Sequence, residues 1–157
     1  MIRILLDELG DGHGDIILKI DVMPVFTRIG DLYYMADFLC LDPDKIDKVP
    51  DDLGVEYIKY VKERLKGLTD SESFIIFNIQ DECIEGLLVS KKNKGLVQVA
   101  YGTTTEIRGH EIDKDVLDPL IDRRTPAFKR QGNWLISLES MISEMDWSIE
   151  RIKKNGS

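Results

Sequence analysis

Three short runs rich in β-branched and aromatic residues occupy the middle of the chain, and very short connections separate them. They are SFIIFNIQ at 73–80, CIEGLLVS at 83–90 and GLVQVAYG at 95–102. Such runs favour β-strands. Connections of a few residues join antiparallel neighbours, because parallel strands need a long crossover. The sequence therefore predicts an antiparallel meander, to which TTTEIRG at 103–109 could add a fourth strand.

A second antiparallel unit is predicted at the N-terminus, where LGDGHGDIILKID at 9–21 places three glycines before an apolar run. A phosphate-binding glycine loop should open a helix, and an EF-hand calcium loop needs flanking helices and an acid at its twelfth position. Neither pattern is present, so we interpret the glycines as a hairpin turn at 10–14. Pro24 then ends the second strand. The predicted register pairs Leu6 with Leu18, Ile4 with Ile20, Ile2 with Val22 and Arg3 with Asp21.

Helical periodicity appears in four places. The predicted helices are a short one around 32–39 with Asp31 as N-cap, an amphipathic one at 55–68 with Gly67 as C-terminal cap, a short one at 114–124 broken near Pro126, and a long one at 133–154 with Asn133 as N-cap. Helices and strands segregate along the chain, which predicts an α+β fold. We expect an antiparallel sheet, made of the N-terminal hairpin and the central meander, with helices on one face and the long C-terminal helix across it.

Length and composition indicate a globular protein. The 157 residues, 43% apolar and 32% charged, predict a single domain over 1–154 with a flexible tail at 155–157. The opening MIRILLDEL lacks the layout of a signal peptide, and no stretch approaches the roughly 18 apolar residues of a membrane helix. We therefore expect a cytoplasmic protein. The spacing of Cys40 and Cys83 fits neither a redox pair nor a zinc knuckle, so we expect reduced, buried thiols.

The net charge of −8, from 29 acidic and 21 basic residues, favours a basic partner over nucleic acid or an anionic membrane. Solubility alone is the alternative explanation. One basic neighbourhood stands out, and it consists of Arg123, Arg124, Phe128, Lys129 and Arg130. Basic residues beside an aromatic suit a phosphate or RNA grip. In so acidic a chain we expect them to pair internally instead.

The acidic residues gather in two clusters. The first lies in a predicted loop and contains Asp42, Asp44, Asp47, Asp51 and Asp52; the second contains Asp113, Asp115, Asp118 and Asp122. Helix caps and solvated loops explain such clusters, but they could equally steer and dock a basic protein. Because aromatics ringed by acids suit an interface hot spot, we take Tyr33, Tyr34 and the first cluster as the candidate partner-binding residues.

No sequence motif identifies the chain as a member of a known enzyme class. The only histidines are His13 and His110, and RGHEIDKDVLD around His110 lacks the second histidine that a zincin helix carries four residues on. No G-x-S-x-G elbow is present, and neither cysteine has a recognisable nucleophile context. We therefore predict no catalytic, metal-binding or cofactor-binding residues. The alternative is a small enzyme or ligand-binding domain whose site lies between the sheet and the long helix, around His110.

In size, acidity and lack of a catalytic signature, the whole chain resembles the small immunity proteins of bacterial contact-dependent and other polymorphic toxin systems. The resemblance implies an α+β cytosolic protein that binds a cognate toxin domain, often a nuclease, and blocks its active site or substrate entry. We therefore expect a non-enzymatic partner of a basic protein, as a monomer or homodimer. A subunit of a larger assembly, joined through a sheet edge or the C-terminal helix, is a further alternative.

Overall fold

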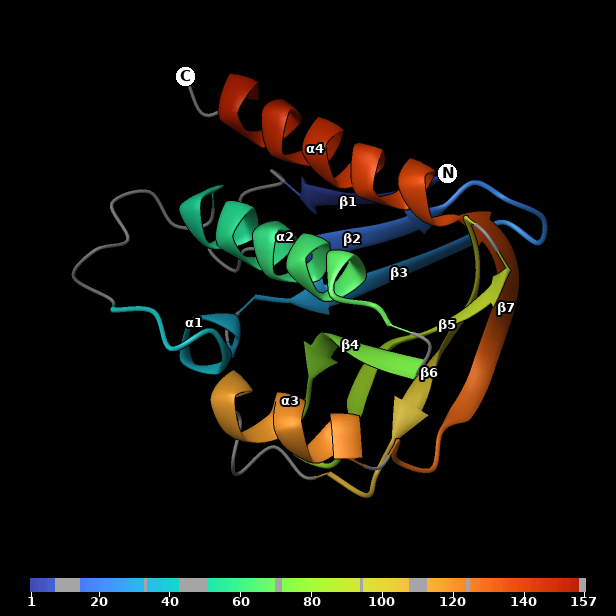
Figure 1. Ribbon diagram of the computed structural model, residues 1–157. Coiled ribbons are helices and arrows are strands. Elements are labelled where there is room, and N and C mark those ends of the chain that lie inside the picture. The colour runs from blue at the N-terminus through green and yellow to red at the C-terminus, as the bar shows by residue number, and fades with distance from the viewer. Residues whose placement is uncertain are drawn as a thin grey trace.

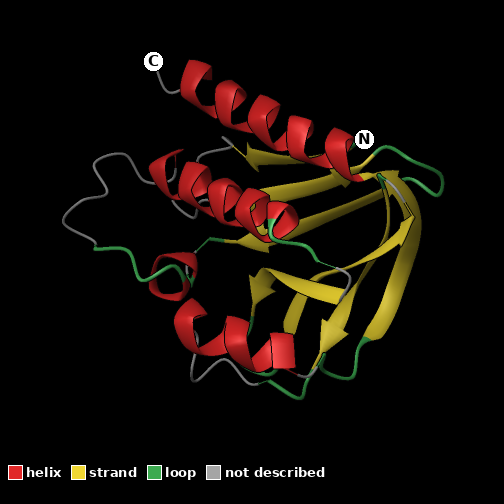
Figure 2. Ribbon diagram, in the orientation of Figure 1, coloured by secondary structure: helices red, strands yellow, loops and turns green. Residues whose placement is uncertain are grey.

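The structure is a computed structural model in which an α+β fold, as predicted, is made of two antiparallel sheets and four helices (Figure 1, Figure 2). It describes residues 1–7, 15–32, 34–42, 51–69, 72–93, 95–107, 113–123 and 125–155. One buried hydrophobic cluster takes side chains from both sheets and from all four helices.

The first sheet has the order β1-β2-β3 and contains one strand that the sequence analysis missed. Its strands are β1 (Ile2–Asp7), β2 (Asp15–Ile20) and β3 (Phe26–Asp31). The hairpin is confirmed, but its predicted register is wrong by two residues, because Ile4 faces Leu18 and Leu6 faces Ile16. An even offset keeps the same side chains on the same face. The apolar face is therefore buried as expected, although His13 and the glycine turn lie outside the described residues.

The register change gives Arg3 a different partner. Arg3 faces Lys19 across the hairpin rather than Asp21. Its Nε donates instead to Glu144 at 2.6 Å, and its guanidinium lies 4.5 Å from the ring centre of Trp147. Both partners belong to the C-terminal helix, so a charge expected to pair within the hairpin ties the hairpin to that helix.

The second sheet has the order β4-β5-β6-β7. Its strands are β4 (Glu72–Ile79), β5 (Ile84–Asn93), β6 (Leu96–Thr104) and β7 (Lys129–Ser137). The predicted meander is confirmed, but its fourth strand is 129–137 and not 103–109. In β7, Trp134 and Ile136 are buried while Leu135 between them is 58% exposed, which is the two-residue period of a strand. Asn133 therefore lies in a strand and is no helix cap.

The helices are α1 (Met35–Phe38), α2 (Asp51–Lys66), α3 (Lys114–Arg123) and α4 (Leu138–Asn155). α2 and α4 lie side by side over the first sheet, with α4 along β1, and α3 packs on β4 (Figure 1). In α2 the apolar face formed by Tyr57, Ile58, Val61 and Leu65 is buried, and the Gly67 N–H donates to Glu63 O at 2.9 Å. α1 is short: Asp31 belongs to β3, and Tyr34 takes the N-cap position. Asn155, expected in the tail, is the last residue of α4.

Side-chain hydrogen bonds satisfy backbone groups on three of the edge strands, namely β4, β3 and β1. The contacts are Tyr57 Oη donating to Ile76 O (2.8 Å) and Arg64 Nη2 to Phe74 O (3.4 Å) on β4, the Asp31 N–H donating to Asn78 Oδ1 (3.3 Å) on β3, and the Ile4 N–H donating to Ser148 Oγ (3.3 Å) on β1. Unpaired backbone groups at an edge need such partners when other elements cover them. These bonds fix α2 against β4 and α4 against β1.

A buried carboxylate joins the two sheets. Glu85 on β5 is 3% exposed and accepts hydrogen bonds from Arg28 on β3, Asn78 on β4 and Tyr101 on β6.

The thiols are less buried than predicted, since Cys40 is exposed and Cys83 partly so. None of the described helices combines the length and apolar character needed to cross a lipid bilayer.

Candidate functional site

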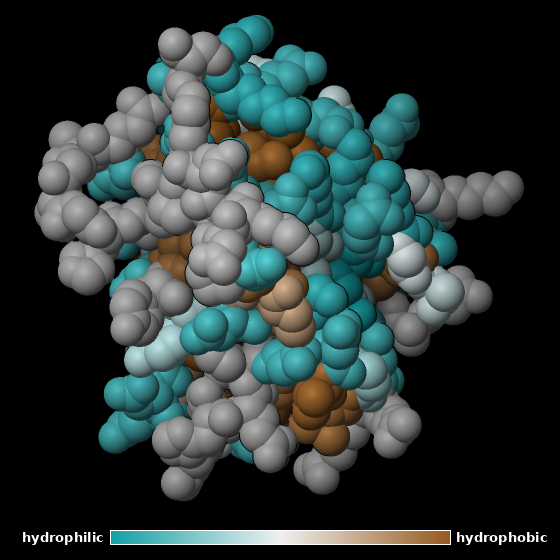
Figure 3. Space-filling view, turned by 90° about the vertical axis from the view of Figure 1, so that its left-hand side faces the viewer, coloured by the Kyte–Doolittle hydropathy of each residue, from teal (hydrophilic) through white to brown (hydrophobic). Residues whose placement is uncertain are grey.

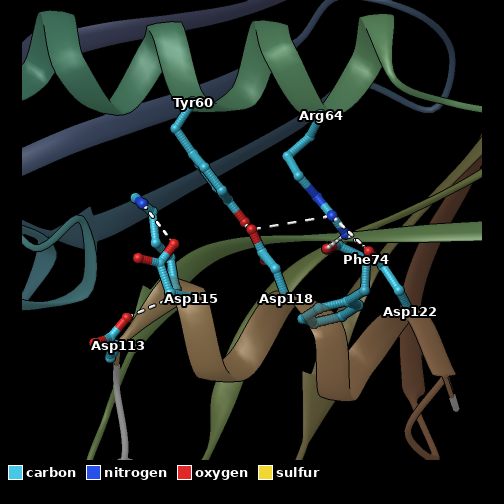
Figure 4. Close-up of polar contacts among 8 residues, drawn as sticks. Tyr60, Arg64, Phe74, Asp113, Asp115, Asp118 and Asp122 are labelled. Carbon is cyan, nitrogen blue, oxygen red and sulfur yellow. Dashed lines mark hydrogen bonds and ion pairs between the residues drawn. The ribbon is translucent and has the colours of Figure 1, made fainter.

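A hollow of about 550 Å³ lies between α2 and α3, beside the residues that follow α1. Its apolar walls are Leu39, Leu41, Pro119 and the ring of Tyr60. Its charged lining is Glu56, Glu63, Arg64, Lys114, Asp115 and Asp118. Among the described lining residues, carboxylates outnumber cations by four to two, so this part of the lining is acidic. In Figure 4, Tyr60 and Arg64 extend from α2 toward Asp118 and Asp122 on α3.

The helical period explains why these side chains meet. α2 turns Tyr57, Ile58, Val61 and Leu65 into the core, which leaves Glu56, Tyr60 and Glu63, three or four residues apart, on a neighbouring face. α3 buries Leu117 and Ile121. This places Lys114, Asp118 and Asp122, four residues apart, on the side toward α2.

Four polar side chains link α2 to α3, and we call them the inner group: Tyr60 and Arg64 on α2, and Asp118 and Asp122 on α3. Tyr60 Oη donates to Asp118 Oδ1 at 2.9 Å, and Arg64 Nη1 and Nη2 donate to the two carboxylate oxygens of Asp122 at 2.9 and 2.8 Å (Figure 4). Arg64 Nη1 also lies 4.0 Å from Asp118 Oδ2. Burial raises the pKa of Asp118 above its ordinary value, although Arg64 and Tyr60 act in the opposite direction. Within the described part of the chain, the buried Nε of Arg64 has no hydrogen-bond partner.

The outer carboxylates are held more loosely. Glu56 pairs with Lys59, Glu63 with Lys66 and Asp115 with Lys114. The side chains of Glu63 and Asp115 are 70% and 76% exposed, against 18% for Asp118. Exposed pairs of this kind contribute about 0–1 kcal/mol and exchange readily. The negative charge available to an approaching molecule is therefore that of Glu56, Glu63 and Asp115.

A contact between Cys40 and Asp113 joins the two acidic clusters. The Cys40 thiol donates to Asp113 Oδ1 at 3.0 Å, and the same oxygen accepts the Asp115 N–H at 2.7 Å. The hydrogen bond to Asp113 raises the pKa of the Cys40 thiol and lowers that of the Asp113 carboxyl. Ligand atoms of Cys40, Asp113 and Asp115 lie within 4.8 Å of one another, but a neutral thiol is a poor metal ligand.

None of the described partner-binding candidates lines the hollow, but three of them lie close in the sequence to residues that do. Asp42 is exposed and follows Leu41, which lines it, while Asp51 and Asp52 open α2 one turn before Glu56. Asp44, Asp47 and Tyr33 lie outside the described residues. Tyr34 is not part of the hollow's lining: it donates to Asp81 Oδ1 at 3.3 Å, beyond the end of β4.

The sequence analysis missed the contribution of α2. It predicted the amphipathic helix at 55–68 but did not connect the polar side of that helix with either acidic cluster. The spacing of Glu56, Tyr60 and Glu63 was the available signal, because it places an aromatic ring between two acids on one face.

The basic neighbourhood is only partly described. Phe128 packs edge-to-face on Phe74, with ring centres 5.4 Å apart. Lys129 and Arg130 are exposed on β7, and neither has an ion pair among the described residues, so the expected internal pairing is not found there. The side chain of Arg123 and all of Arg124 lie outside the described residues.

A second hollow, of about 500 Å³, lies between β1 and α4, where the alternative reading placed a ligand site. Its described lining combines aliphatic residues with Asp7, Ser148, Arg151 and Asn155. Ser148 Oγ accepts a hydrogen bond from the Ile4 N–H, and His110 is outside the described residues.

Comparisons of the chain with protein-family models, with curated proteins and with solved structures found no match.

Proposed function

We propose that this protein is a non-enzymatic binding protein that neutralises a basic protein, such as a toxin domain, by covering its active site. The observation that carries the proposal is a hollow whose described lining includes four carboxylates, two of them (Asp115 and Asp118) from the second acidic cluster, beside the segment that leads into the first. Asp42, Asp51 and Asp52 lie at the described ends of the first cluster, and Asp113 and Asp115 belong to the second. More than sixty positions of sequence separate them, and the Cys40–Asp113 contact joins their segments.

Charge gives this surface a physical role in binding. A protein that acts on nucleic acid must present positive charge to its substrate. An acidic inhibitor is attracted to that same surface, which raises the association rate and makes it sensitive to salt. The net charge of −8 adds a long-range field of the right sign.

Co-expression with the product of an adjacent gene tests the proposal. If that product arrests growth, this protein should restore growth and form a complex with it that survives size-exclusion chromatography. Charge reversal at the rim, Glu56→Lys with Glu63→Lys, should weaken the complex by about tenfold or more, because two attractions become repulsions.

A matched control is available on α4, where Glu139 and Glu150 are exposed. Glu139→Lys with Glu150→Lys makes the same change of net charge away from the hollow and should leave growth protection intact. Equal loss in the two double variants would show that only net charge matters. Absence of any complex, together with turnover of a small substrate by the purified protein, would refute the proposal.

A further inference from the structure

α3 carries an apolar face that the rest of the described molecule does not cover. Leu117 and Ile121 are each 2% exposed and face the core, whereas Val116 and Leu120, one turn apart, are 49% and 53% exposed. Figure 3 shows hydrophobic surface at the height of α3, with hydrophilic residues beside it and further hydrophobic surface higher on the same face. Neither residue lines the hollow, but Val116 precedes Pro119, which does, by three residues and so lies beside it on the helix surface.

The hollow itself suits a long side chain with a charged end. Leu39, Leu41, Pro119 and the ring of Tyr60 offer apolar surface to a methylene stem, while Glu56, Glu63 and Asp115 at the rim offer carboxylates to a cationic head. Lysine and arginine combine such a stem and head. A volume of about 550 Å³ is ample for one such side chain.

We infer that the hollow between α2 and α3 receives a lysine or arginine side chain of the partner, while apolar residues beside it in the partner pack on Val116 and Leu120. This inference rests on the proposed function and specifies the recognition element. Charge complementarity selects a basic partner over a second copy of the chain, because two copies would bring acidic rims of equal sign together.

A peptide titration tests the inference without requiring the partner. The ¹⁵N-labelled full chain is titrated with Ac-Leu-Lys-Leu-NH2 and, as a neutral match, with the same peptide acetylated on the lysine Nε. The amide signals of α2 and α3 should shift and saturate with a millimolar dissociation constant for the charged peptide. The acetylated peptide should bind at least about five-fold more weakly than the charged peptide, because it lacks the attraction to the rim carboxylates.

Variants separate the charged part of the site from the apolar part. Glu56→Gln with Glu63→Gln, and separately Val116→Ser with Leu120→Ser, should each weaken the charged peptide about five-fold, since all four side chains are solvent-accessible and their loss spares the core. The control Glu139→Gln with Glu150→Gln should stay within about two-fold of the parent protein.

The inference is wrong if both peptides bind equally, if the shifts lie away from α2 and α3, or if all double variants behave alike. It is also wrong if the free protein is a dimer with α3 in its interface, because a second copy would then be the occupant. Failure of the toxin co-expression with a positive peptide titration would refute the proposed function alone. The reverse pattern would refute only the lysine-and-apolar recognition.

Discussion

Replacement of Glu85 by glutamine should destabilise the protein by about 2–3 kcal/mol at pH 7. Glu85 Oε2 accepts from Arg28 Nε, Asn78 Nδ2 and Tyr101 Oη, each at 3.1 Å, and Oε1 accepts from Arg28 Nη2. Glutamine keeps the shape but turns one acceptor into an NH2 group, which faces donors. The carboxylate is 3% exposed, so water does not reach it to compensate.

The magnitude follows from the bonds to Arg28. A hydrogen bond to a charged group contributes about 1.5–3 kcal/mol. Of the two bonds from Arg28, one becomes a donor–donor contact, and the other keeps its oxygen acceptor but loses the negative charge. The side chain of Arg28 is 39% exposed, so its guanidinium recovers part of this energy from water. The net cost is therefore nearer to one such bond than to two, with a remainder from the weakened bonds of Asn78 and Tyr101.

The effect should depend on pH in a defined direction. Burial by itself raises the pKa of Glu85, but the hydrogen bonds from Arg28, Asn78 and Tyr101 outweigh it and leave the pKa below its ordinary value. A lowered pKa in the folded state contributes stability above the pKa of the unfolded chain, about 4.3 for glutamate. That contribution is lost as pH falls below this value, so the difference between parent and variant should shrink in acid.

Urea unfolding at pH 7 and at about pH 3 measures both effects. Glu82→Gln is the matched control, because Glu82 is exposed in the turn before β5 and its substitution makes the same change of charge. Its cost should stay within about 0.5 kcal/mol. Equal stability of the two variants at pH 7 would refute the assignment of Glu85 as the link between the sheets. A Glu85→Gln cost unchanged in acid would refute the ionised state.

Three further outcomes follow from the contacts of single residues. Gly86→Ala should cost about 2 kcal/mol or more in urea unfolding, because the new Cβ would lie 2.3 Å from a carbonyl oxygen of β4; a neutral result would mean that β4 and β5 separate easily. Tyr57→Phe should lower the unfolding free energy by about 1–2 kcal/mol, since it leaves a buried carbonyl oxygen of β4 unsatisfied, and an unchanged melting temperature would contradict that contact. In a Cys83→Ser background, Asp113→Asn should speed the reaction of Cys40 with a disulfide reagent at pH 8, because the carboxylate raises the pKa of that thiol; a slower or unchanged rate would contradict the bond.

Local patterns predicted most of the secondary structure, and they failed where two periods fit the same residues. The segment NWLIS at 133–137 continues the helical apolar spacing of α4, yet it also alternates Trp134 and Ile136 with Leu135. Over five residues the two periods are indistinguishable. Pairing with β6 decides in favour of the strand, and Val99 faces Trp134 there. β3 was missed for a different reason, because FTRIGD has few apolar residues and lies just after Pro24.

Register and site depended on contacts that the sequence does not display. The observed register of the hairpin differs from the predicted one by two residues. Both registers place the same side chains on the same face, so the hydrophobic pattern could not select between them. The acidic clusters were visible as counts of aspartates, but the hollow beside them depends on how α3 packs beside α2. Only the spacing within α2 carried a local hint, in Glu56, Tyr60 and Glu63.

The carboxylates near the hollow divide into two groups by their partners. Asp118 and Asp122 are bound by Tyr60 and Arg64, and they hold α3 against α2. Among the described residues, the rim carboxylates pair with lysines whose side chains are 33–51% exposed, and a partner can displace these lysines at little cost. Because the inner group fixes the helices, the rim keeps its geometry while its charges remain exchangeable. An acidic surface organised in this way can exchange its own lysines for the cations of a partner without any change in the fold.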